Sequence, residues 1–113
     1  MKESAIQKSV MNLLQIYENM GKMVCARTNS GKVQISRKNG STGWMSTGKR
    51  GFPDIVCLCQ GQFIGLEVKT ESGTLSKDQI RMKKMILLCG GRYYIVRSAN
   101  DVKEIVDNIL KGG

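Results

Sequence analysis

Asp54, Glu67 and Lys69 are the side chains whose types and spacing could carry out chemistry. Glu67 and Lys69 are two residues apart in a segment with strand character, so both point to the same side of a strand. Two carboxylates that face each other across a sheet repel, and they require positive charge between them. Mg²⁺ or Mn²⁺, which bind oxygen ligands, would meet this requirement, and an ordinary salt bridge to Lys69 is the alternative.

The spacing of Asp54 and Glu67 depends on a predicted β-hairpin. Residues 54–59 and 62–69 have strand character, and Gln60-Gly61 between them has the composition of a tight turn. A two-residue turn places Asp54 directly opposite Glu67, with Cβ atoms roughly 4.5–5.5 Å apart. Apart from Gln62 at the turn, the other face of the hairpin is apolar and carries Ile55, Cys57, Cys59, Ile64, Leu66 and Val68. The carboxylate face also carries Val56, Leu58 and Phe63, so side-chain alternation alone does not fix the pairing.

Gly51-Phe52-Pro53 precedes Asp54 and predicts a sharp entry into the first strand of this hairpin. Proline lacks an amide hydrogen, so it is confined to the start or edge of a strand, and it favours an extended conformation at the residue before it. Glycine permits the tight approach. We therefore expect Asp54 at a strand entrance, where its carboxylate can reach solvent and substrate.

Hydrophobic periodicity and turn residues predict the other elements. We expect helices at residues 3–20, 77–89 and 100–111, strands at 22–28, 54–59, 62–69 and 92–97, and a hairpin or flexible arm at 32–45. Ser76 is the expected N-cap of the second helix, with Gln79 as its capping-box partner. We expect at least one of Tyr93 and Tyr94 in the core. This order predicts a single domain over residues 1–113, of the α/β class, with a mixed central sheet flanked by helices.

The net charge is +9, and no acidic residue lies between Glu18 and Asp54. A basic block rich in glycine and serine suits contacts with phosphate, so we expect it to bind DNA; a merely solvated loop is the alternative. Trp44 within the block is interpreted either as a platform for base stacking or as a buried anchor at the base of the hairpin. The residues expected to bind DNA are Lys32, Arg37, Lys38, Lys49 and Arg50.

The composition also excludes several classes of protein. The chain has no histidine, so histidine-based nucleases and Ser-His-Asp or Cys-His hydrolases are excluded. The four cysteines form no C-x-x-C pair and lie in apolar stretches, which favours reduced core thiols over a zinc site. No apolar run is long enough to cross a bilayer, and the N-terminus lacks the apolar block of a signal peptide. We expect a cytoplasmic protein with no small-molecule cofactor.

Gly51-Phe52-Pro53-Asp54 followed by Glu67-Val68-Lys69 resembles the signature of the PD-(D/E)XK nuclease superfamily. Within it, the sequence is most similar to the virus-type replication-repair nuclease (VRR-NUC) family. Glu3 and Gln7 near the N-terminus, the glycine-rich basic segment and Leu75-Ser76-x-x-Gln79 also fit that family, so the resemblance covers nearly the whole chain. It implies a restriction-endonuclease-like αβββαβ core.

The resemblance also implies a function. The protein would be a Mg²⁺- or Mn²⁺-dependent DNA endonuclease selective for branched or junction DNA, and a stand-alone phage- or prophage-like member that forms a homodimer like a Holliday-junction resolvase. Asp54, Glu67 and the Val68 carbonyl would bind the metal, and Lys69 would activate the attacking water. Glu3 would complete the acidic site, and Gln79 would position the lysine or the substrate.

Other interpretations remain open from the sequence. The basic residues could belong to a non-catalytic nucleic-acid-binding module in which Asp54, Glu67 and Lys69 form a structural ion cluster. A sequence-specific restriction-type enzyme is a further alternative, although residues 30–50 offer little material for base recognition. Glu3 also suits the dipole of the first helix, and Gln79 is explained by the capping box alone.

Overall fold

The computed structural model describes residues 1–28, 32–46 and 48–112, apart from the side chains at positions 32, 33, 45 and 46. The elements follow the expected order, with boundaries shifted by a few residues. They are α1 (Glu3–Asn19), β1 (Val24–Arg27), β2 (Lys32–Ser36), β3 (Thr42–Ser46), β4 (Ile55–Cys59), β5 (Gln62–Val68), α2 (Lys77–Leu88), β6 (Arg92–Val96) and α3 (Ala99–Leu110).

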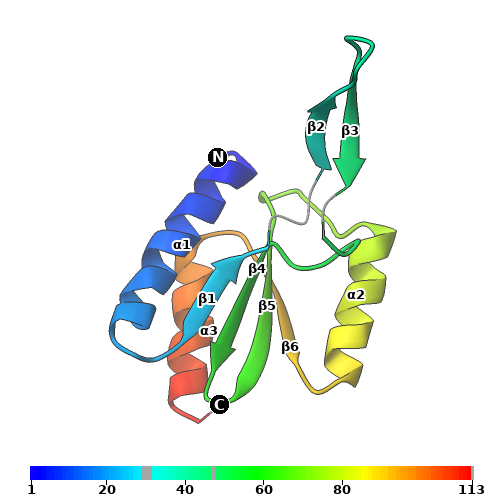
Figure 1. Ribbon diagram of the computed structural model, residues 1–113. Coiled ribbons are helices and arrows are strands. Elements are labelled where there is room, and N and C mark those ends of the chain that lie inside the picture. Colours follow the sequence, from blue (N-terminus) through cyan, green and yellow to red (C-terminus); the bar gives the residue numbers. More distant parts are fainter. Residues whose placement is uncertain (29–31, 47, 113) are drawn as a thin grey trace.

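Four strands form a mixed sheet with the order β1-β4-β5-β6 (Figure 1). The β1–β4 and β4–β5 pairs are antiparallel, and the β5–β6 pair is parallel. Helices α1 and α3 cover one face of the sheet, and α2 packs on the other face beside β6. The predicted α/β class with a mixed sheet between helices is confirmed.

The larger hydrophobic core lies between the sheet and the pair α1 and α3. The apolar face predicted for the 54–69 hairpin points into it, because alternate residues of β4 and β5 share one side of the sheet. The Tyr17 hydroxyl donates a 2.8 Å hydrogen bond to Asp107 and links the two helices. The core contains Ile6, Val10, Leu14, Tyr17, Met23, Ile55, Cys57, Cys59, Ile64, Leu66, Val68, Val96, Val102, Val106 and Ile109.

A smaller core lies beneath α2 on the other face of the sheet. Tyr93 is buried there with Met82 and Ile86, whereas Tyr94 is partly buried against the larger core. The prediction that at least one of these tyrosines is in the core is confirmed. Cys89 is exposed at the end of α2, so the expectation that all four cysteines are core thiols is wrong at that position.

The predicted register of the β4–β5 hairpin is confirmed. Cys59 pairs with Gln62, and Ile55 pairs with Leu66. Gln60 and Gly61 both have positive φ, 53° and 75°, as the tight turns that best match strand twist require. The strands are shorter than predicted, because β4 begins after Asp54 and β5 ends before Lys69. Asp54 therefore lies at the strand entrance and not within the strand.

Strands β2 and β3 form a separate two-stranded hairpin, which we call the arm, and it projects away from the four-stranded sheet (Figure 1). The arm turns at Gly40, which has a φ of 83°. Thr28, at the end of β1, donates from its backbone N to the Asp54 carbonyl (3.0 Å) and from its hydroxyl to the Pro53 carbonyl (2.6 Å). These bonds hold together the two chain segments between which the arm is inserted.

No helix in the described part of the chain is long and apolar enough to cross a membrane.

Candidate active site

Asp54 is held against β5 by contacts on its own residue and on the residue before it. Its Oδ2 accepts a 2.8 Å hydrogen bond from the backbone N of Val68. The buried ring of Pro53 packs on Gly65, where an added Cβ would lie only 2.6 Å from Pro53 Cγ. Because Gly65 has no side chain, the Pro53 ring can lie directly on the sheet. This contact positions the backbone of Asp54 next to β5.

Gly51 anchors the same segment to α2. Its φ is 72°, which L side chains rarely adopt, and an added Cβ would lie 2.3 Å from the carbonyl oxygen of Asp78 in the first turn of α2. The chain that carries Asp54 therefore touches both the sheet and the start of α2. Local sequence patterns identified the turn at Gly51, but not its contact with α2.

Glu67 lies on the face of β5 opposite the larger core, and its side chain is 2% exposed. Its Oε2 accepts a 3.1 Å hydrogen bond from Gln79 Nε2 and lies 3.9 Å from Lys69 Nζ. Its Oε1 is buried and has no hydrogen-bond partner among the described residues. When Glu67 is ionised, this buried oxygen has no hydrogen-bond donor, which is costly without a further ligand.

The surroundings of Glu67 favour its protonated form. Burial, followed by the adjacent Asp54 carboxyl, raises the pKa of Glu67 to about 9, although the charge of Lys69 acts in the opposite direction. Glu3 contributes a smaller increase. The nearby lysine alone does not offset burial and repulsion, so a salt bridge to Lys69 accounts for only part of the arrangement.

Gln79 both caps α2 and contacts Glu67. Its Oε1 accepts a 2.9 Å bond from the backbone N of Ser76, and its own backbone N donates to Ser76 Oγ at 3.2 Å. This is the capping box that the sequence predicted. Because the cap uses the carbonyl end of the amide, the Nε2 end is free to reach Glu67. Helix capping alone therefore does not account for the position of Gln79.

Lys69 follows the end of β5 and is 12% exposed. Its backbone N bonds the Val96 carbonyl of β6 at 3.1 Å. The loop that follows it is held by Arg97, whose Nη1 donates to the carbonyl oxygens of Thr70, Glu71 and Gly73. Sequence reasoning missed Arg97, because its three acceptors come from a loop more than twenty residues earlier in the chain.

The donor set is compatible with a divalent cation. Paired carboxylates with an unsatisfied buried oxygen are suited to Mg²⁺ or Mn²⁺. Among the described residues, however, no group of three or more Asp, Glu, Cys or His side chains is placed to hold a metal ion. Glu3 is exposed in the first turn of α1, and its role in the acidic site stays a prediction. The role of the Val68 carbonyl stays a prediction as well.

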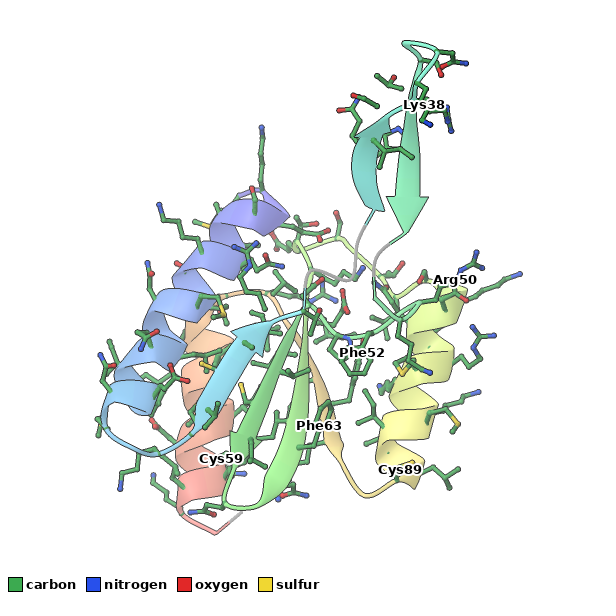
Figure 2. All side chains as sticks on the ribbon, viewed as in Figure 1. Lys38, Arg50, Phe52, Cys59, Phe63 and Cys89 are labelled. Atoms are coloured by element: carbon green, nitrogen blue, oxygen red, sulfur yellow. The ribbon has the colours of Figure 1, made fainter. Side chains whose placement is uncertain are left out.

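The basic residues expected to bind DNA are spread over two places. Arg37 and Lys38 are exposed at the tip of the arm, and Lys49 and Arg50 are exposed between the arm and α2 (Figure 2). Lys32 begins β2, and its side chain lies outside the described part of the structure. The described side chains among them do not form one patch beside Glu67.

Trp44 on β3 is 65% exposed, so its interpretation as a buried anchor is wrong.

No family model and no curated protein matches the sequence. Among solved structures, a chain titled "VRR_NUC domain" superposes with a TM-score of 0.61 at 20% sequence identity, covering 93% of this chain and 94% of that chain. This likeness shows the fold, in which the helices, the mixed four-stranded sheet and the hairpin match a restriction-endonuclease-like VRR_NUC architecture. The fold implied by the sequence resemblance is therefore confirmed.

Proposed function

We propose that this protein is a Mg²⁺- or Mn²⁺-dependent deoxyribonuclease that cuts phosphodiester bonds within branched or junction DNA. The observation that carries the proposal is the buried Glu67 carboxyl group beside Asp54 and Lys69, whose ionised form has one oxygen without a hydrogen-bond donor. Such an arrangement is electrostatically unfavourable by itself and becomes favourable when a cation binds. The fold shared with a VRR_NUC domain supports the proposal by analogy.

In this proposal Asp54 and Glu67 hold the cation, which supplies Lewis-acid activation of the phosphate and of water. The Val68 N–H fixes one carboxylate, and Gln79 Nε2 fixes the other, so both are oriented before the substrate arrives. The ammonium of Lys69, 3.9 Å from Glu67, provides positive charge where negative charge develops on phosphorus. Burial around Glu67 reduces the screening of these charges by water.

The DNA would be held by charge-assisted contacts from the arm and from the segment before Gly51. Arg37, Lys38, Lys49 and Arg50 are exposed and able to meet phosphates. We include a homodimer in the proposal, because a four-way junction offers two equivalent strands to cut and a two-fold arrangement of sites matches that symmetry.

Cleavage assays with a Lys69→Ala variant test the proposal. Supercoiled plasmid, linear duplex and four-way junction DNA are incubated with wild-type protein, with and without Mg²⁺ or Mn²⁺, and with the variant. We expect metal-dependent cuts by the wild type, a loss of at least about 100-fold in rate for the variant, and unchanged DNA affinity.

Two other outcomes of this assay would contradict the proposal. Binding without cleavage under every condition would favour the non-catalytic nucleic-acid-binding module. Equal cleavage by the variant and the wild type would exclude Lys69 from the chemistry.

A further inference from the structure

Trp44 is the protein's single tryptophan and is 65% exposed on β3 of the arm. It pairs with Gln34 across the two strands, and Ser36 and Thr42, which are described on the same face of the ribbon, are exposed and polar. A large aromatic ring is therefore presented to solvent on a polar surface, away from both core clusters. Covering such a ring with a partner is favourable.

The opposite face of the arm is already occupied. Arg37 Nη1 donates a 3.0 Å hydrogen bond to the Thr42 carbonyl, and the guanidinium packs where Gly43 has no side chain. Gly43 precedes Trp44 and so faces the other side of the ribbon. Arg37 therefore covers part of one face of the arm, whereas the indole on the other face is exposed.

The charge of the arm favours a nucleic acid as the partner of Trp44. Lys38 is exposed at the tip (Figure 2), and no acidic residue lies between Glu18 and Asp54 in the sequence. A two-stranded ribbon fits the major groove, and basic side chains can hold the flanking phosphates. In that position the indole of Trp44 would lie next to the bases.

An exposed indole can discriminate between kinds of DNA, because the faces of the bases are accessible only in some of them. In a fully paired duplex each base is stacked on its neighbours, so its face is not available. An unpaired base, a strand end or a branch exposes a face on which an aromatic ring can stack. We propose that Trp44 stacks on an unpaired nucleobase, so that the arm directs the protein to DNA with unpaired or branched positions. This inference rests on the proposed function, since it takes DNA as the substrate.

The single tryptophan allows a direct test by fluorescence. The wild-type protein, in EDTA so that no cleavage occurs, is titrated with a matched duplex, with the same duplex carrying a central unpaired loop, and with a four-way junction. Binding is followed separately by anisotropy of a dye on the DNA. We expect strong quenching of tryptophan emission by the looped and branched DNA, and little quenching by the matched duplex once it is bound.

Variants extend the test to affinity. Trp44→Ala should weaken binding to looped DNA about tenfold and change binding to the matched duplex less than about twofold. Trp44→Phe should lie between the alanine variant and the wild type, and Gln34→Ala, at the paired position on β2, serves as the control with little effect. Thermal stability of Trp44→Ala should equal that of the wild type, because the side chain is exposed.

The results separate this inference from the proposed function. Equal quenching by all bound DNAs, no quenching, or an equal loss of affinity for all DNAs in Trp44→Ala would overturn the role of Trp44, even if the protein cleaves DNA. Absence of metal-dependent cleavage would reject the proposed function, whereas selective quenching would still support stacking. A protein that binds no DNA would overturn both.

Discussion

At the scale of single residues, the proton of Glu67 links the site to the stability of the protein. The folded state raises the pKa of Glu67 from 4.5 to about 9, chiefly through burial. Between these pH values the folded protein binds a proton that the unfolded chain has released. The free energy of unfolding therefore falls as the pH rises through this range. A bound cation would remove the penalty by stabilising the ionised carboxylate.

Glu67→Gln should stabilise the metal-free protein at pH 8 by about 1 kcal/mol or more and should have little effect at pH 5. Chemical denaturation in EDTA at the two pH values measures the change. Added Mg²⁺ or Mn²⁺ should raise the melting temperature of the wild type but not that of the variant.

Glu104→Gln, which removes an exposed carboxylate from α3, is the matched control and should leave the pH dependence unchanged. If Glu67→Gln keeps the wild-type loss of stability between pH 5 and pH 8, the buried carboxyl does not have a raised pKa.

At the scale of elements, the start of α2 has two roles that substitutions can separate. Ser76 accepts a hydrogen bond that caps the helix, and Gln79 completes the cap while its other end contacts Glu67. The cap stabilises the helix, and the same interaction fixes the rotamer of the amide. Helix stability and orientation of the acidic pair are thus coupled through one side chain.

Ser76→Ala and Gln79→Ala should each lower the free energy of unfolding by about 1 kcal/mol, because each removes part of the capping box. Only Gln79→Ala should also reduce the Mg²⁺-induced rise in melting temperature and the rate of DNA cleavage by more than about tenfold, since it removes the donor to Glu67. Thermal denaturation and cleavage rates measure the two effects. Equal metal responses in the two variants would make Gln79 a helix cap only.

Elements set by local pattern could be predicted from the sequence, and contacts that depend on folding could not. The Gln60-Gly61 turn fixed the β4–β5 register, and Ser76 and Gln79 marked the start of α2, because these signals lie within a few residues. The packing of Pro53 on Gly65 and the hold of Arg97 on the loop after Lys69 were missed, because each joins residues from separate elements. The exposure of Trp44 does not follow from the sequence either, because it depends on the projection of the arm away from the sheet.

At the scale of the whole molecule, the described residues leave an apolar part of the sheet exposed on the face where α2 packs. Val24 pairs with Leu58, and Leu58 pairs with Phe63, so the three side chains form an apolar row across β1, β4 and β5. They are 63%, 53% and 37% exposed. An exposed apolar row of this kind is typical of a protein interface, so we expect it to lie in the proposed homodimer interface.

Leu58→Asp should convert the proposed homodimer to a monomer without loss of folding, because the side chain is exposed and the substitution places a charge in the proposed interface. Light scattering coupled to size exclusion measures the mass, and the thermal melt reports the fold. Lys111→Asp, on an exposed residue after α3, is the control for added negative charge. A monomeric wild type at micromolar concentration would contradict the homodimer.

The hydrogen bonds of Thr28 to Pro53 and Asp54 have a consequence for how such a protein can diversify. They close the sheet beneath the arm, and the described residues of both cores come from elsewhere in the chain. The two cores therefore do not depend on the described residues of the arm, so we expect the rest of the protein to tolerate replacement of the arm. We expect that its length and tip can change, by evolution or by grafting, while the acidic site formed by Asp54 and Glu67 keeps its shape.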